Sequence, residues 1–252
     1  MVHPMAGDAR YGEDQGAANP AVAAALAAFA EGRSGERAVL TALAGSRLLV
    51  PVVAVLADGA SAAGESVGEA GAAAASTAAP RPGVLRGEKT SEMAMPEIVG
   101  RDGRRAIPAF TCADSLQRWR AGARPVPVPA ADVWQAAVQE SRAVVIDIAG
   151  PVPLAVEGSR LAALAAGEGV PGLDEDPDVW QQVAAAAAQV APGIRVRLSP
   201  PRGDLDFTLE LAPPAGSAGL VPEEVASRIA DAIHDRLPFR IRGGIAVIRR
   251  PG

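Results

Sequence analysis

The longest strongly apolar run, Leu48 to Ala57, limits the folds available to this chain more than any other feature. It is too short to cross a bilayer, which takes about 20 apolar residues. Its richness in valine and leucine instead predicts a buried strand, in which Pro51 marks an edge position or a bulge. Helical patterns occur on both sides of this strand, so the chain is predicted to be an α+β protein.

Composition indicates a core with few aromatic rings. Hydrophobic residues make up 49% of the chain and aromatic residues only 3%, so Ala, Leu and Val must build the core. The basic residues are nearly all arginine, with Lys89 the single lysine; with abundant Ala, Gly, Pro and Val, this indicates a GC-rich bacterial genome. The 252 residues suffice for one large domain or two small ones.

Charge and cysteine content indicate a cytoplasmic protein. The net charge of −5 argues against a nucleic-acid partner, because such a partner requires a basic surface. Cys112, the single cysteine, excludes an internal disulfide, and no secretory signal or membrane partner is expected. Arginines near the C-terminus are interleaved with acidic residues, and we interpret them as a mixed surface: Arg236, Arg240, Arg242, Arg249 and Arg250.

The chain is predicted to contain two domains. Residues 1–19 are polar and Gly-rich and are expected to be disordered. Residues 20–168 form a mixed α/β N-terminal domain, in which residues 58–88 are a flexible Ala/Gly-rich insertion that cannot bury enough apolar surface to fold. After a linker at 169–176, residues 177–252 form a smaller two-layer α-β sandwich of order αββαβ, with two helices on one face of an antiparallel sheet.

Local signals set the expected element ends in the first domain. Asn19, followed by Pro20, caps one helix, Ser34 caps the next, and Gly45 ends it in a left-handed conformation. Residues 93–99 and 105–110 are predicted as two strands joined by a turn at Asp102-Gly103.

Several short motifs occur in order between residues 35 and 168 once the insertion is removed. Together they resemble the SseB protein N-terminal domain family. The motifs are Leu48-Leu-Val-Pro-Val-Val53, Glu92-Met-Ala-Met95, Asp102-Gly-Arg-Arg-Ala-Ile-Pro-Ala-Phe-Thr111, Ser115-Leu-Gln-Arg-Trp119, Arg124-Pro-Val-Pro-Val128, Val144-Val-Ile-Asp-Ile-Ala-Gly-Pro151 and Leu161-Ala-Ala-Leu-Ala-Ala-Gly167.

The resemblance implies an α+β domain and no established reaction, so it transfers no catalytic residue. The family is named after a serine-sensitivity phenotype. This chain departs from the family in its long insertion and in Cys112, which stands where a serine is expected after Phe-Thr. A position that tolerates this exchange is not expected to hold an obligatory nucleophile. The C-terminal region resembles no family.

Five residues are candidate binding residues: Thr111, Cys112, Asp114, Trp119 and Asp147. Thr111 is predicted to cap a helix with Asp114 at its third position, which places Cys112 in the first turn, where backbone amides favour a thiolate. Asp147 is the one acid in an apolar strand, and a hydrogen-bonded structural role is the stronger interpretation. Trp119, Trp134 and Trp180 have the spacing of core residues, although Trp119 precedes a Pro-rich connector and could be partly exposed.

Other patterns are interpreted as structural, and neither a metal site nor a cofactor is expected. Gly167 to Gly172 matches G-x-G-x-x-G but follows a helix and contains a proline, unlike a phosphate loop. Asp176 is predicted to cap a helix that begins at Pro177, since the residues around it lack the glycine and the final acid of a calcium loop. His3 and His234 lack zinc-type spacing with any other ligand.

Three functions remain open. The first is a non-catalytic interaction or regulatory protein, which binds another protein through a groove between the domains or an apolar patch near Trp119 and residues 125–129. The second is a small-molecule binding protein or an enzyme of serine or sulfur metabolism, including sulfurtransferase-like use of Cys112. The third is an oligomerisation module that pairs edge strands between two copies of the chain.

Overall fold

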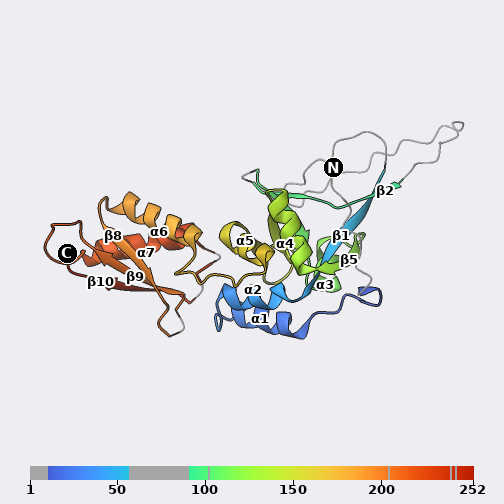
Figure 1. The fold of residues 1–252 in the computed structure, drawn as a ribbon, viewed down its shortest axis with the longest axis horizontal. Helices are drawn as coiled ribbons and strands as arrows, with labels where there is room; N and C mark the ends of the chain where they lie inside the picture. Colours follow the sequence, from blue (N-terminus) through green and yellow to red (C-terminus); the bar gives the residue numbers. More distant parts are fainter. Residues whose placement is uncertain (1–10, 57–90, 102, 204, 239, 242) are drawn as a thin grey trace, which may run out of the picture.

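The structure, a computed structural model, describes residues 11–56, 91–101, 103–203, 205–238, 240–241 and 243–252. It has the predicted α+β fold, with one group of elements before residue 170 and another after residue 176 (Figure 1). Each group has its own buried cluster, built mainly from Val, Leu, Ile and Ala. The predicted insertion at 58–88 and Asp102 lie outside the described residues. None of the described helices is long and apolar enough to span a membrane.

Two sheets form the first group. The first has the order β2-β1-β5, and the second the order β3-β4-β6-β7. The helices packed around them are α1 (Pro20–Ala30), α2 (Glu36–Ala44), α3 (Ala113–Trp119), α4 (Ala130–Gln139) and α5 (Gly158–Ala166). The strands are β1 (Arg47–Leu56), β2 (Ser91–Ala94), β3 (Ile98–Val99), β4 (Arg105–Ala109), β5 (Arg124–Pro129), β6 (Ala143–Ile146) and β7 (Leu154–Val156).

Prolines explain two differences from the expected strands. The segment 93–99 is divided into β2 and β3, and Pro96 lies between them, where its missing N–H removes a ladder donor. Pro51 lies in the central strand β1, which is neither an edge nor shown to be bulged. The backbone nitrogen of Pro51 points to the side of β1 opposite β5. On that side it lies between the bridge from Leu49 to Phe110 and the first pair with β2, at Val53, so the missing N–H interrupts neither.

The free edge of β5 presents no backbone donors at its three proline positions. Leu49 exchanges both backbone hydrogen bonds with Phe110, at 2.8 and 2.9 Å. The backbone N–H and C=O groups of Leu49 therefore point away from its β5 neighbour Pro127. Alternate residues of a strand point their N–H and C=O groups to opposite sides. Pro125, Pro127 and Pro129 therefore point outward and carry no N–H, which argues against β5 as an edge that pairs with a second copy of the chain.

The predicted cap of α1 is confirmed, whereas both predicted ends of α2 differ in the structure. Asn19 Oδ1 accepts a hydrogen bond of 2.9 Å from the Ala21 N–H, as predicted. Ser34 does not cap α2: Gly35 is the cap residue, and it provides no side-chain bond. Gly45 ends α2, but with φ −93° it is not left-handed.

Residues 11–19 differ from the disordered tail expected through residue 19, because Arg47 binds this segment to the domain. The Arg47 Nε atom donates to Asp14 Oδ2 at 2.5 Å, and its Nη2 atom donates to the Ala17 carbonyl at 2.5 Å. The bond from Arg47 holds the pKa of Asp14 below its usual value. Gly16 packs so closely on Ala113 that an added Cβ atom would lie 2.8 Å from the Ala113 Cβ.

The second group has the predicted αββαβ order and the strand order β10-β9-β8. On α7 the buried Ala226, Ile229 and Ile233 recur at helical spacing. The predicted antiparallel sheet is wrong for β10, which runs parallel to β9 because α7 forms the crossover between them. Its elements are α6 (Pro177–Val190), β8 (Arg195–Ser199), β9 (Phe207–Ala212), α7 (Glu223–Arg236) and β10 (Ile245–Arg249).

Candidate functional site

Thr111 and Asp147, two of the candidate binding residues, meet in the structure. They follow β4 and β6, which are parallel neighbours, so their side chains reach the same end of the sheet. The Thr111 N–H donates to Asp147 Oδ1 at 2.9 Å, and the Thr111 hydroxyl donates to Asp147 Oδ2 at 2.6 Å. Both residues are buried, and Asp147 has a φ of +47°. The carboxylate is therefore hydrogen-bonded within the fold, the arrangement expected of a structural acid.

Cys112 and Asp114 do not join this pair. Cys112, rather than the expected Thr111, is the cap residue of α3, and it makes no side-chain cap bond. Its Sγ atom lies 3.3 Å from Ser115 Oγ, whose hydroxyl also donates to the Cys112 carbonyl at 3.0 Å. Asp114 points to solvent in the first turn. The thiol is thus engaged with a hydroxyl group, not with an acid–base partner.

Replacing Cys112 by serine is expected to change the free energy of unfolding by less than about 0.5 kcal/mol. A serine hydroxyl can make the same contact with Ser115. Thermal unfolding of Cys112→Ser beside the wild type would check this, and a loss above about 2 kcal/mol would show that the sulfur has a role which the contact does not explain.

The three tryptophans lie in different environments. Trp134 is fully buried, as predicted. Trp119 is half-buried and packs on Phe110, with ring centroids 5.4 Å apart, while the Arg120 guanidinium lies 5.6 Å from its ring centre. Trp180 is 50% exposed, so its expected core position is wrong. Its neighbours Val179 and Val183 form the buried face of α6 instead.

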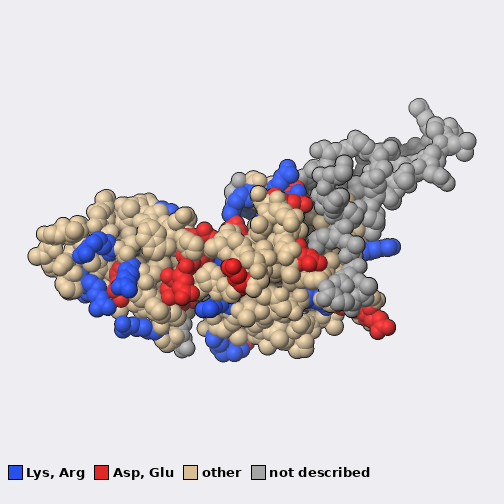
Figure 2. All heavy atoms as spheres, viewed as in Figure 1, with Lys and Arg blue, Asp and Glu red and all other residues tan. Residues whose placement is uncertain are grey.

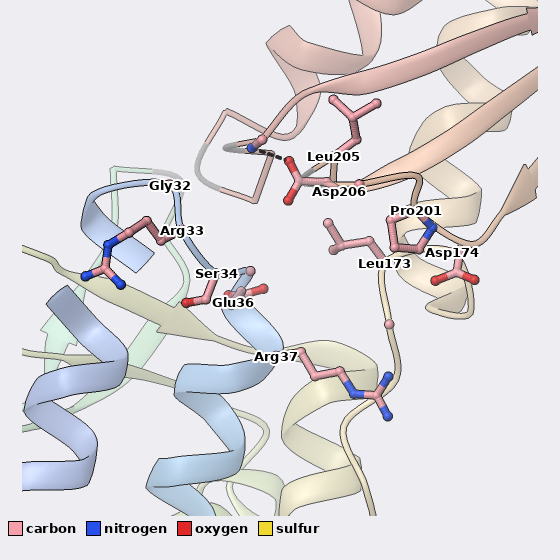
Figure 3. Close-up of a pocket in the computed structure, with 14 residues that line it drawn as sticks. Gly32, Arg33, Ser34, Glu36, Arg37, Leu173, Asp174, Pro201, Leu205 and Asp206 are labelled. Carbon is pink, nitrogen blue, oxygen red and sulfur yellow. Dashed lines mark hydrogen bonds between the residues drawn. The ribbon is translucent and has the colours of Figure 1, made fainter. Parts of the chain in front are cut away.

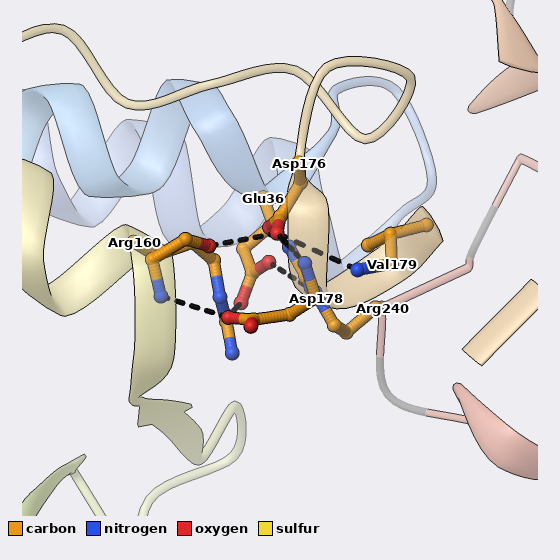
Figure 4. A network of polar contacts seen from close by, with 7 residues as sticks. Glu36, Arg160, Asp176, Asp178, Val179 and Arg240 are labelled. Carbon is orange, nitrogen blue, oxygen red and sulfur yellow. Dashed lines mark hydrogen bonds and ion pairs between the residues drawn. The ribbon is translucent and has the colours of Figure 1, made fainter. Parts of the chain in front are cut away.

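A buried network of ion pairs joins the two groups of elements (Figure 4). Glu36, at the start of α2, pairs with Arg160 of α5 and, at 3.3 Å, with Arg240, which follows α7. The other end of Arg240 bonds Asp176 at 2.7 Å. Burial lowers the pKa of Arg160, against the effect of Glu36. The network therefore connects segments that are distant in the sequence.

Asp176 and Asp178 extend this network to the start of α5. Asp176 caps α6, as predicted, and also accepts the Ser159 hydroxyl at 2.7 Å. Burial favours the protonated acid, but the bonds from Ser159 and Arg240 prevail and hold the pKa of Asp176 below its usual value. Asp178 accepts the Ser159 N–H at 2.7 Å, and its carboxylate fills the place that a side chain at Gly158 would occupy.

A cleft of about 280 Å³ lies beside the network (Figure 3). Its walls are the α1–α2 loop at residues 32–37, the linker at 172–174 and the β8–β9 loop, with Gly243. Figure 2 shows acidic side chains at the surface where the two groups of elements meet. A cleft therefore lies between the two groups of elements. Among the described residues, no cluster of His, Cys, Asp and Glu side chains is arranged to hold a metal ion.

The sheet β10-β9-β8 has one covered face and one open face. Phe207, Leu209 and Leu211 of β9 are fully buried with residues of α6 and α7. By register, the opposite face carries Arg195 and Arg197 of β8 beside Ala212 and Glu210 of β9. Arg250, directly after β10, lies on the same face and pairs with Glu210 at 3.1 Å. We call this surface the open sheet face; its residues are Arg195, Arg197, Ser199, Glu210, Ala212, Ala246, Ile248 and Arg250, while Thr208, which shares the face by register, is buried.

Comparison with known families assigns most of the first group of elements to a family. The model of the SseB protein N-terminal domain matches residues 22–163, more than half of the chain. The chain belongs to the SseB family. No curated protein and no solved structure matches it. The match begins within α1 and includes most of the span of the motifs, residues 35–168, that indicated the family.

Two features outside the candidate residues were missed by the sequence analysis. The SseB domain provides Glu36 and Arg160 to the buried network, but their charges carry no local signal of burial. Arg240 belongs to the arginine cluster that was interpreted as mixed surface, yet its side chain is only 12% exposed. The open sheet face could have been found, because Arg195 and Arg197 alternate with the apolar residues of a predicted strand.

Proposed function

We propose that this SseB-family protein is a non-catalytic interaction protein that binds an acidic segment of another protein on the open sheet face. The observation that carries the proposal is the charge of that face. Arg195, Arg197 and Arg250 surround the single acid Glu210, and all three arginines are exposed. In Figure 2 basic side chains gather over the C-terminal elements.

The charges on this face are arranged to leave a basic surplus. The Arg250 hydrogen bond lowers the pKa of Glu210, with a further contribution from the charge of Arg197, so Glu210 stays ionised and holds Arg250 in place. Arg195 donates to the Pro213 carbonyl at 3.0 Å, a neutral partner that leaves its charge uncompensated. Carboxylates of a partner can pair with Arg195 and Arg197 without displacing Glu210.

An acidic protein segment fits this face better than a nucleic acid. Single-stranded nucleic acids bind through stacking on aromatic rings as well as through phosphate contacts, and none of the residues of the open sheet face is aromatic. The arginines are confined to one face of one small sheet, which suits a short segment with a few carboxylates.

The double variant Arg195→Gln/Arg197→Gln is expected to bind a fluorescein-labelled Glu-rich decapeptide about tenfold more weakly, since two surface ion pairs contribute about 1.4 kcal/mol together. Fluorescence anisotropy at low and high salt measures this, and the wild-type affinity should fall as salt rises. The matched control is Arg118→Gln/Arg228→Gln, which removes two exposed arginines from α3 and α7.

Two results would overturn the proposal. One is an equal loss of peptide binding in the control variant, because the effect would then follow net charge alone. The other is tighter binding of a deoxythymidine decamer than of the peptide, with the same dependence on Arg195 and Arg197, which would make a nucleic acid the ligand.

A further inference from the structure

The cleft between the SseB domain and the C-terminal elements has the features of a second binding site, separate from the open sheet face. We propose that it binds a small zwitterion, a molecule that carries one carboxylate and one ammonium group. Its volume of about 280 Å³ suits a compound of amino-acid size better than a larger cofactor. Clefts between domains are frequent places for such ligands.

Five charged residues line the cleft, but three of them are already engaged. Arg33 pairs with Glu31 at 2.5 Å. Glu36 belongs to the buried network, where it pairs with two arginines. Asp206 Oδ2 accepts the backbone N–H groups of Gly243 and Gly244 at 2.7 and 3.0 Å. The two remaining charges belong to Arg37 and Asp174.

Figure 3 shows Arg37 and Asp174 among the residues that line the cleft, and both side chains lie near Gly172. A Cβ atom at Gly172 would lie 2.7 Å from Asp174 Oδ1 and 3.8 Å from Arg37 Nη1. Within the described part of the chain, no ion pair joins the two side chains to each other or to another residue. The Asp174 carboxylate thus lies over the bare backbone of Gly172, and the Arg37 guanidinium lies near the same point without pairing with it.

A zwitterion matches this arrangement because its two charges satisfy both side chains at once. Its carboxylate pairs with the Arg37 guanidinium, and its ammonium group pairs with Asp174. A ligand that carries a carboxylate but no amine is repelled by the carboxylates of Asp174 and Asp206. A ligand that carries an amine but no carboxylate is repelled by the guanidinium of Arg37.

Binding of three related compounds tests the proposal: L-alanine, its amide L-alaninamide, and N-acetyl-L-alanine. The first carries both charges, the second only the ammonium group and the third only the carboxylate. Amide chemical shifts of the full chain, followed by NMR during each titration, report both affinity and place. We expect saturable shifts around Gly172 for L-alanine, with an affinity at least about tenfold above that of either singly charged compound.

Arg37→Gln and Asp174→Asn should each weaken L-alanine binding about tenfold, while Glu175→Gln, which removes the exposed acid next to Asp174, should leave it unchanged. Thermal unfolding checks that all three variants fold, since neither Arg37 nor Asp174 has an ion pair to lose. The proposal fails if no compound shifts the Gly172 region, if all three bind equally, or if Arg37→Gln binds as tightly as the wild type. Shifts confined to Arg195 and Arg197 would also reject the cleft and leave the open sheet face as the anion site.

Discussion

Replacing Glu36 by alanine is expected to lower the free energy of unfolding by about 3–5 kcal/mol. Glu36 is 4% exposed and accepts from two arginines, one of which, Arg160, is itself buried. Removing the carboxylate leaves the Arg160 charge buried without its partner, and this desolvation is the main cost. Arg160 Nε already lacks a hydrogen bond among the described residues, so the loss of Glu36 leaves a second donor of the same guanidinium without its partner. Chemical denaturation measures the loss.

The Glu36→Ala effect should be distinguishable from that of an ordinary surface pair. Arg33→Gln breaks a pair whose side chains are 62% and 58% exposed, so it should cost less than about 1 kcal/mol. In Glu36→Leu/Arg160→Met both buried charges are replaced by apolar groups while Arg240 keeps Asp176, so the double variant should be more stable than Glu36→Ala. Equal stability of Glu36→Ala and the wild type would show that the network contributes nothing.

The network also connects the two groups of elements, because Glu36 and Arg240 stand 204 positions apart in the chain. In Glu36→Ala we therefore expect faster protease cleavage in the linker at 169–176, relative to Arg33→Gln. This follows from the loss of one of the contacts across the junction, while the bonds from Ser159 to Asp176 and Asp178 remain.

Local signals in the sequence predicted those features that depend on neighbouring residues. Asn19 with Pro20 and Asp176 with Pro177 are helix starts because cap and first turn are adjacent in the chain. The αββαβ order of the C-terminal elements follows from periodicity in the same way. These features need no knowledge of what lies across the fold.

The other features depend on partners far along the chain. Thr111 has the local pattern of a cap, but Asp147, 36 positions later, takes its hydroxyl, and the cap moves to Cys112. The direction of β10 was wrong because register depends on the crossover through α7. Arg240 resembled a surface arginine because its ion-pair partner Glu36 is distant in the sequence and no neighbouring residue indicates the pair. Residue spacing in the sequence therefore could not predict the buried network. Asp147 could be predicted as a hydrogen-bonded residue, because a single acid in an apolar strand requires a hydrogen-bond donor.

Replacing Asp147 by alanine should destabilise the protein by about 3 kcal/mol, for two separable reasons. The carboxylate accepts two buried hydrogen bonds from Thr111, and bonds to a charged group contribute about 1.5–3 kcal/mol each, less than additively. Asp147 is also left-handed, with φ +47°, a conformation that costs alanine about 1 kcal/mol more than it costs aspartate or glycine. Denaturant unfolding of Asp147→Ala beside Asp147→Gly measures the two contributions, because glycine loses the bonds without the backbone strain.

Two further variants decide between a structural and a catalytic carboxylate. Asp147→Asn keeps one acceptor for the Thr111 N–H, so its loss should be about half that of Asp147→Ala. Thr111→Val removes the hydroxyl bond alone, and in the Asp147→Ala background it should cost much less than in the wild type, because the two residues act as a pair. A group held for chemistry at the expense of stability behaves in the opposite way: its neutral replacement stabilises the fold. A gain in stability for Asp147→Asn would therefore contradict the structural role and support a functional role for this candidate binding residue.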